Sequence, residues 1–141
     1  MSLIFSRHCE YALQAVVYLA LKPTGEMTSI RDLASKLEIP YHFLAKIFQG
    51  LSRKGLLASR KGPTGGFALG MPAKEITLYH IVEAIDGLDF KEKCVMGFPE
   101  CSGRNPCAMH DTWGELREGI ASMLMRKNVA QLAADMKKSD R

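Results

Sequence analysis

The sequence predicts a mainly α fold with one small β-hairpin, and two observations support this prediction. Apolar residues recur at helical spacing in segments at both ends of the chain, whereas the glycine-rich turn GPTGG separates two short β-prone segments near the middle. With 141 residues, 47% hydrophobic and 24% charged, the chain has the size and balance of one soluble globular domain, or of a small domain with an added element for assembly. This length leaves no room for a large enzyme.

The first predicted helix covers residues 8 to 21, HCEYALQAVVYLAL, and ends at Pro23 and Gly25. Its apolar residues surround nearly the whole helical wheel, which predicts burial on more than one side. The apolar run is shorter than the roughly 20 residues of a membrane span, and no small-residue cleavage site follows it. We therefore expect a cytoplasmic protein without membrane association.

A second and a third helix are expected next, with only a short break between them. Ser29 can cap the second helix, TSIRDLASKLEI, and Asp32 completes a capping-box arrangement. After the break at Glu38 and Ile39, Pro40 suits the first position of the third helix, PYHFLAKIFQGLSRK, because its missing N–H costs nothing there.

The third predicted helix has two different faces. One face is apolar and is expected to pack on the core through Phe43, Leu44, Ile47 and Leu51. The opposite face offers hydrogen-bond donors, positive charge and one small residue, namely His42, Ala45, Lys46, Gln49 and Arg53. Such a face suits a helix that lies in the major groove of double-stranded DNA.

The segments LLASRK and FALG, which follow Gly55, are predicted as two strands joined by GPTGG. Two helices with a tight break and a following hairpin make a winged helix-turn-helix, in which the third helix reads the groove and the wing contacts the DNA backbone or minor groove. The alternative is a small helical core whose hairpin binds nothing. A phosphate cradle is set aside, because GPTGG follows no strand-to-helix turn and lacks a GK[ST] ending.

Positive charge is concentrated in the front half of the chain. The net charge is +4, and no Asp or Glu occurs between residues 39 and 74. That segment contains Lys46, Arg53, Lys54, Arg60, Lys61 and Lys74. A segregated positive surface indicates a polyanionic partner, and a solvated basic face without a partner is the alternative.

The back half is expected to hold a short helix within ITLYHIVEAIDG, residues 76 to 87, capped by Thr77. After a loop, HDTWGELREGIASMLMRK and NVAQLAADMKK are two amphipathic segments. The first has apolar residues at helical spacing: Trp113, Leu116, Ile120, Met123 and Leu124. Standing alone, this long helix would expose apolar surface that a two-fold partner would bury, and a homodimer would also match a palindromic operator.

Three parts are therefore expected. Residues 1–90 form the DNA-binding domain, residues 91–109 a cysteine-rich loop that binds a cluster, and residues 110–141 a dimerisation helix with a helical tail.

The loop gathers three of the four cysteines, Cys94, Cys101 and Cys107, and His110 follows. In a cytoplasmic protein such a group indicates metal binding or redox chemistry rather than disulfides. Three thiolates and an imidazole are a complete ligand set for zinc or for an iron–sulphur cluster. The wide spacing favours a cluster, because structural zinc sites usually contain cysteine pairs two to four residues apart. A thiol switch, inert cysteines and an ordinary His110 remain alternatives.

The sequence as a whole resembles the IscR, NsrR and RirA group of bacterial transcription regulators. The resemblance runs through EYALQAVVYLA, GPTGGFAL, ITLYHIVEAIDG and CAMHDTW. It implies a homodimer of winged-helix subunits joined by the long C-terminal helix. It also implies a [2Fe-2S] or [4Fe-4S] cluster in each loop, which controls operator binding in response to iron–sulphur status, iron, redox state or nitric oxide.

By position, the resemblance assigns Cys94, Cys101 and Cys107 as metal ligands and His110 as the fourth. In relatives without this histidine, an acidic residue of the partner's first helix is the fourth ligand, and Glu10 matches it. Both possible fourth ligands are therefore present, and the first cysteine interval is one residue longer than in IscR, so the cluster type stays open. Cys9 is expected to be a buried helix cysteine rather than a ligand.

The resemblance also places DNA contacts, although the side chains differ from those of IscR. Tyr41, His42, Ala45 and Lys46 match the part of the recognition helix that meets base edges, and Lys61 matches a wing residue that enters the minor groove. The full set of expected DNA-binding residues is Tyr41, His42, Ala45, Lys46, Gln49, Arg53, Arg60, Lys61 and Thr64.

The function predicted from the sequence is therefore sequence-specific DNA binding under the control of an iron–sulphur cluster. A zinc-stabilised DNA-binding or interaction module without redox sensing is the main alternative. A small thiol enzyme that uses Cys107 and His110 is disfavoured, because no oxyanion donors or third partner are recognisable. We expect no enzymatic activity and no small-molecule substrate.

Overall fold

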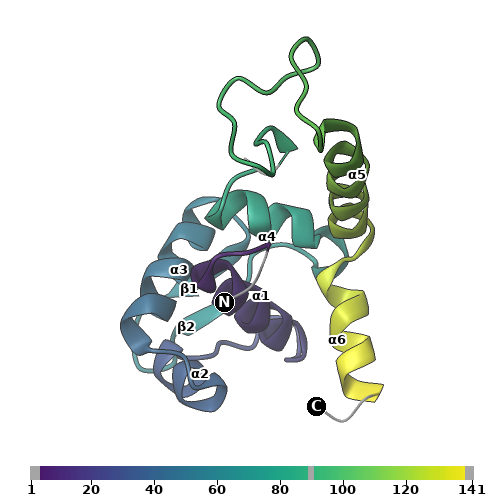
Figure 1. The fold of residues 1–141 in the computed structure, drawn as a ribbon. Coiled ribbons are helices and arrows are strands. Elements are labelled where there is room, and N and C mark those ends of the chain that lie inside the picture. Colours follow the sequence, from purple (N-terminus) through teal and green to yellow (C-terminus); the bar gives the residue numbers. More distant parts are fainter. Residues whose placement is uncertain (1–3, 89–90, 139–141) are drawn as a thin grey trace.

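The computed structural model describes residues 4–88 and 91–138 (Figure 1). In chain order the elements are α1 (Arg7–Ala20), α2 (Ile30–Leu37), α3 (Tyr41–Arg53), β1 (Leu57–Arg60), β2 (Gly66–Leu69), the 3-10 turn η1 (Ala73–Glu75), α4 (Leu78–Ile85), α5 (His110–Arg126) and α6 (Val129–Lys138). The mainly α fold with one antiparallel hairpin is therefore confirmed. The expected domain boundary at residue 90 and the end of the tail at 139–141 lie outside the described residues.

Helix α1 is the centre of the core, as its all-round apolar pattern predicted. It packs against α2, α3, α4, α6 and β2. Ala12, Ala15 and Val16 are fully buried, and their small side chains allow the neighbouring elements to approach closely. Ser6 caps the helix by accepting a hydrogen bond from the backbone N–H of Cys9. The Asp86 carboxylate accepts hydrogen bonds from the backbone N–H and the hydroxyl of Ser6, so the start of α1 is tied to the end of α4.

The helix-turn-helix forms as the sequence predicted, with one shift at its turn. Ser29 Oγ accepts a hydrogen bond from the backbone N–H of Asp32 at 3.1 Å and caps α2. Glu38 takes the left-handed conformation, φ 56°, and turns the chain towards α3. Ile39, 4% exposed, anchors this turn in the core. Pro40 is the N-cap of α3 rather than its first helical residue.

The prediction that Phe43 faces the core is wrong. Its side chain is 46% exposed, and its ring lies edge-on to the His8 ring of α1 with 5.2 Å between centroids. The core face of α3 consists of Leu44, Ile47, Phe48 and Leu51. These positions form one i, i+3, i+4, i+7 stripe, which leaves residue 43 at its edge.

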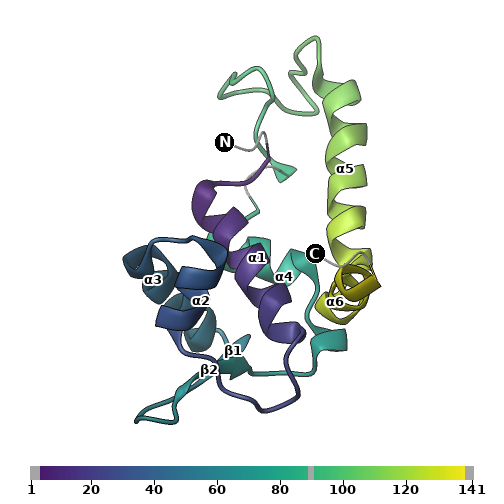
Figure 2. The same cartoon turned by 90° about the horizontal axis from the view of Figure 1, so that it is seen from below.

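The hairpin pairs β1 with β2 antiparallel, with Leu57 opposite Leu69. β1 lies within the predicted segment LLASRK and is one residue shorter at each end, and β2 begins and ends one residue before FALG. Thr28 exchanges backbone hydrogen bonds with Phe67, which fixes the hairpin beside the start of α2. Because a Cβ atom at Gly66 would lie 2.3 Å from the Thr28 carbonyl oxygen, this close approach requires glycine. The hairpin tip points away from α5 (Figure 2).

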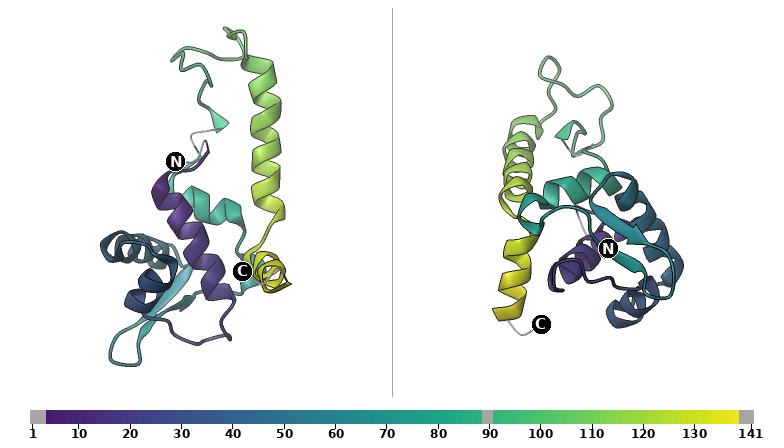
Figure 3. Two further views of the ribbon diagram at one scale, coloured as in Figure 1. Left: turned by 60° about the horizontal axis from the view of Figure 1, so that its bottom comes forward. Right: turned by 180° about the vertical axis from the view of Figure 1, so that it is seen from behind.

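The two C-terminal helices occupy different places. Val129 and Ala133 of α6 are buried, and α6 packs against α1 and η1. Backbone hydrogen bonds from Leu78 N–H to the Lys127 carbonyl at 3.0 Å and from Val129 N–H to the Ile76 carbonyl at 2.8 Å fix the joint between α5 and α6. Helix α5 extends from this joint to the cysteine loop, away from the winged half, which comprises α1 to α3 and the β1–β2 hairpin (Figure 3).

Much of the apolar surface of α5 faces solvent in the single chain. Leu124 is fully buried against Cys9 and Val82. Leu116 and Met123, however, are 57% and 38% exposed. Within the described ranges, no helix combines the length and the apolar character needed to cross a membrane.

Candidate functional site

The cysteine loop projects from the fold between α4 and α5 (Figure 1). Its backbone is a chain of tight turns. Examples are the hydrogen bonds from Gly97 N–H to the Cys94 carbonyl and between Ser102 and Asn105 in both directions. Gly97 has φ 82°, a left-handed turn conformation that glycine adopts without strain. These turns shape the backbone between successive cysteines.

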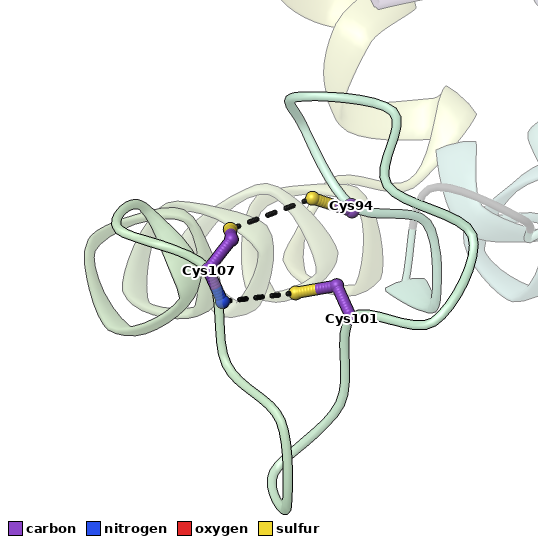
Figure 4. A group of neighbouring side chains, drawn as sticks. All are labelled: Cys94, Cys101 and Cys107. Atoms are coloured by element: carbon purple, nitrogen blue, oxygen red, sulfur yellow. Dashed lines mark hydrogen bonds between the residues drawn. The ribbon is translucent and has the colours of Figure 1, made fainter.

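The three loop cysteines converge on one point, as Figure 4 shows. Their Sγ atoms all lie within 4.8 Å of one another. Sγ of Cys94 is 3.5 Å from Sγ of Cys107, and the backbone N–H of Cys107 donates to Sγ of Cys101 at 3.4 Å. His110, the first residue of α5, places Nδ1 3.5 Å from Sγ of Cys101. The structure therefore brings together the three cysteines that the sequence singled out as ligands and places His110 beside one of them, Cys101.

The local electrostatics differ among the thiols. The pKa of Cys94 is lowered to about 7: partial desolvation opposes this shift, but hydrogen bonds from the backbone N–H groups of Phe98 and Met96 outweigh it. The pKa of Cys107 is raised, because desolvation and the two neighbouring thiols outweigh a backbone hydrogen bond from Met109. Backbone N–H groups therefore support a thiolate at Cys94, the form that binds metals.

The donor set fits a metal centre. Thiolates and imidazole are the ligands preferred by zinc and by iron–sulphur clusters. A cavity of about 20 Å³ is lined by the three cysteines and His110 together with Trp113 and Arg117 of α5. A cleft of about 330 Å³ is also lined by Cys101 and Cys107 and is open to solvent.

Two residues of this site were missed by the sequence analysis as functional residues. Trp113 Nε1 donates to the Lys93 carbonyl at 3.0 Å, and Arg117 Nη1 donates to the Lys91 carbonyl at 2.5 Å. Trp113 was interpreted only as part of an apolar stripe. Their spacing from His110, three and seven residues, places all three on one face of α5, and this spacing is the signal that could have identified them.

The other possible ligands lie on α1. Glu10 is partly buried and lies 3.8 Å from Arg7 in an ion pair. Cys9 is a buried helix cysteine, as expected. Burial, together with the nearby Asp86 carboxylate, raises its pKa to about 12.

The expected DNA contacts lie on the surface. On α3, Tyr41, His42, Lys46, Gln49 and Arg53 are exposed and Ala45 is half-buried. The rings of Tyr41 and His42 lie edge to face, with centroids 5.8 Å apart. In the wing, Arg60, Lys61 and Thr64 are exposed. The core stripe holds this face of α3 outward.

Comparison with known proteins agrees with this architecture. The model of the Rrf2 family, described as iron-dependent transcriptional regulators, matches residues 5–135. A putative HTH-type transcriptional regulator of Aquifex aeolicus is 35% identical over 92% of this chain and 91% of its own length. The HTH-type transcriptional regulator IscR of Yersinia pseudotuberculosis is 32% identical over 86% of this chain and 74% of its own.

Solved structures show the same fold. CymR, the global cysteine regulator of B. subtilis, has a TM-score of 0.81 at 24% identity and covers 94% of this chain and 98% of its own. IscR of T. potens has a TM-score of 0.78 at 20% identity and covers 100% and 93%. These neighbours are transcriptional regulators rather than enzymes. Family match, sequence relatives and fold agree, and the chain belongs to the Rrf2 family of transcriptional regulators.

Proposed function

We propose that this regulator binds operator DNA under the control of an iron–sulphur cluster held by Cys94, Cys101 and Cys107. The observation that carries this proposal is the convergence of the three Sγ atoms within 4.8 Å of one another. They meet in a loop between a DNA-reading half and a long exposed helix. A change at the metal there can act on both neighbours.

The proposal that the protein binds DNA rests on the charge and shape of its surface. The exposed face of α3 and the basic wing are both free of acidic residues. In a winged helix-turn-helix, such a helix reads base edges in the major groove while the wing contacts the backbone or the minor groove. The backbone contacts of Arg60 and Lys61 would supply affinity, and the α3 side chains would supply specificity.

We further propose a cytoplasmic homodimer that binds a palindromic operator. The support is the apolar surface of α5, where Leu116 and Met125 are 57% and 52% exposed. A second copy would bury this surface. A dimer would also allow Glu10 of the partner subunit to compete with His110 for the fourth ligand position.

An iron–sulphur cluster would supply a group that gains or loses electrons and is damaged by oxidants or nitric oxide. The chain's contribution is to hold the thiolates together and leave them reachable through the open cleft beside Cys101 and Cys107. Operator affinity changes only if the two states of the loop differ in their free energy of DNA binding. The sensor role therefore requires that a conformational change in the cysteine loop alters the DNA-binding surface formed by α3 and the wing.

One observation favours a second candidate, a zinc-stabilised regulator without redox sensing. A tetrahedral ion with Zn–S bonds of about 2.3 Å separates its sulphurs by about 3.8 Å. The 3.5 Å between Cys94 and Cys107 is close to that value.

Anaerobic purification distinguishes the two candidates. Visible absorption with iron, sulphide and zinc analysis should give a brown protein that contains iron and sulphide. A colourless protein loaded with zinc would rule out the cluster and leave the zinc candidate. Cys101→Ser should abolish the binding of either metal, whereas Ser102→Ala, at the next position, should retain it.

The fourth ligand is tested with His110→Ala and Glu10→Ala. The variant that lacks the true ligand should shift the visible spectrum and accelerate cluster loss to a chelator. If both variants match the wild type, neither residue is a ligand.

A further inference from the structure

Two α5 side chains hold the first arm of the cysteine loop, residues 91–93, by its main chain. Arg117 donates to the Lys91 carbonyl at 2.5 Å, and Trp113 donates to the Lys93 carbonyl at 3.0 Å. The second of these carbonyls belongs to the residue directly before Cys94. These two hydrogen bonds therefore fix the position from which the Cys94 side chain extends.

The first arm needs such support because the rest of the loop is held mainly by its own turns. None of the residues 91–109 is buried, so apolar packing does not determine their positions. The turn hydrogen bonds at Cys94–Gly97, Phe98–Cys101 and Ser102–Asn105 are local. They shape each turn but do not set the distance between Cys94 and Cys107.

Cys107 is held from the other side of the site. The backbone N–H of His110 donates to the Cys107 carbonyl at 3.2 Å, at the beginning of α5. The α5 helix thus controls both ends of the loop, through its first turn and through the Trp113 and Arg117 side chains. His110, Trp113 and Arg117 follow each other at i, i+3 and i+7, which is one helical face.

The opposite end of α5 is fixed to the DNA-binding half. Leu124 is fully buried against Cys9 of α1 and Val82 of α4. The backbone pairing of Leu78 with Lys127 and of Val129 with Ile76 locks the helix end. The α5 side chains that hold the loop therefore belong to a helix that is anchored to α1 and α4.

We infer that Trp113 and Arg117 are positioning residues that hold Cys94 opposite Cys107 and tie the first arm of the loop to α5. Neither is a metal ligand. Both act through main-chain carbonyls, so a displacement of Cys94 is transmitted to α5. This inference rests on the proposed metal site. The test below gives different results if the metal site is wrong and if only the positioning role of Trp113 and Arg117 is wrong.

The test uses the full chain, stripped of metal without oxygen and titrated with Co²⁺ alone. Thiolate-bound Co²⁺ absorbs in the near ultraviolet and visible range, so the titration reports thiolate ligation without any DNA assay. Arg117→Gln and Trp113→Phe should each weaken Co²⁺ binding roughly tenfold, the lower end of the effect of partners that orient metal ligands. Arg117→Lys should restore most of the affinity, because the guanidinium makes a single hydrogen bond that an ammonium can replace.

Arg126→Gln is the matched control. Arg126 is exposed on the same helix and donates a hydrogen bond to the Ser122 carbonyl of that helix, so the Co²⁺ affinity of Arg126→Gln should equal that of the wild type. Trp113 is the only tryptophan of the chain. Its fluorescence should be quenched by Co²⁺ in the wild type and in Arg117→Lys, and less so in Arg117→Gln at equal occupancy.

Far-ultraviolet circular dichroism confirms that each variant is folded before titration. Wild-type Co²⁺ affinity in folded Arg117→Gln and Trp113→Phe would overturn the inference, while loss of binding in Cys101→Ser would leave the metal site standing. Equal losses in Arg126→Gln would also overturn it, because they would indicate a general effect on α5. A wild-type chain that binds no Co²⁺ through thiolates would overturn both the metal site and the inference.

Discussion

The winged half and the cysteine loop are stabilised in different ways. In the winged half, Leu33, Leu44, Phe48 and Leu51 are essentially inaccessible to solvent. In the loop, Met96 and Phe98 are 54% and 55% exposed, and hydrogen bonds and turns take the place of a core. Apolar packing therefore determines the winged half, whereas the loop is held by its own hydrogen bonds and by α5. This division fits the proposed sensor role, because one part can change while the other stays folded.

The largest expected contrast is in thiol reactivity. In the metal-free protein at about pH 8, Cys94, whose pKa is lowered to about 7, should react quickly with a chromogenic disulfide reagent. Cys9 should react at least about 1000-fold more slowly, because a pKa of about 12 against an ordinary 9 lowers its thiolate fraction and burial blocks access. Four equally fast thiols would show that the winged half opens as readily as the loop.

A pair of phenylalanine substitutions compares packing in the two regions. Phe48→Ala removes a fully buried ring and should lower the free energy of unfolding by about 3–5 kcal/mol. Phe98→Ala removes a ring that is 55% exposed and should change it by less than about 0.5 kcal/mol. Urea unfolding followed by circular dichroism measures both. A large loss in Phe98→Ala would mean that the loop contributes to the core.

A lysine pair tests whether DNA binding belongs to the winged half alone. Lys61→Ala should weaken binding to every DNA sequence by roughly 5- to 10-fold at 0.1 M salt and reduce the salt slope by about one, because one phosphate contact is lost. Lys137→Ala, which removes the same charge from α6, should leave both unchanged. Fluorescence anisotropy at several salt concentrations gives both quantities. Unchanged DNA binding in Lys61→Ala would contradict the wing assignment.

The smallest contrast compares two serines that accept backbone hydrogen bonds. Ser29→Ala removes the cap of α2 and should lower the free energy of unfolding by about 1 kcal/mol. Ser102→Ala removes a similar bond to Asn105 N–H in the loop and should leave global unfolding unchanged. Its expected effect is local, as faster amide exchange at Asn105. Equal destabilisation in both variants would mean that loop and winged half unfold together.

Several elements could be predicted because their signals are local. Ser29 and Thr77 were expected as helix caps, and the structure shows both. The hairpin followed from GPTGG. The three cysteines and His110 were expected as ligands from residue type, spacing and the family resemblance, and the structure brings the three cysteine Sγ atoms within 4.8 Å of one another. Phe43 was misplaced because helical spacing defines a stripe with uncertain edges. The contact with His8 that decides its position comes from another helix.

Capping residues, glycine turns and helical periodicity act over a few residues, so they could be read from the sequence together with the soft donor groups of the cysteine loop. Which residues meet across the chain became visible only in the folded molecule. It brought Cys94 within 3.5 Å of Cys107, aligned Trp113 and Arg117 with main-chain carbonyls about 20 or more residues away, and returned α6 to α1. Such contacts depend on the path of the whole chain and on the packing of its core, which no short segment encodes.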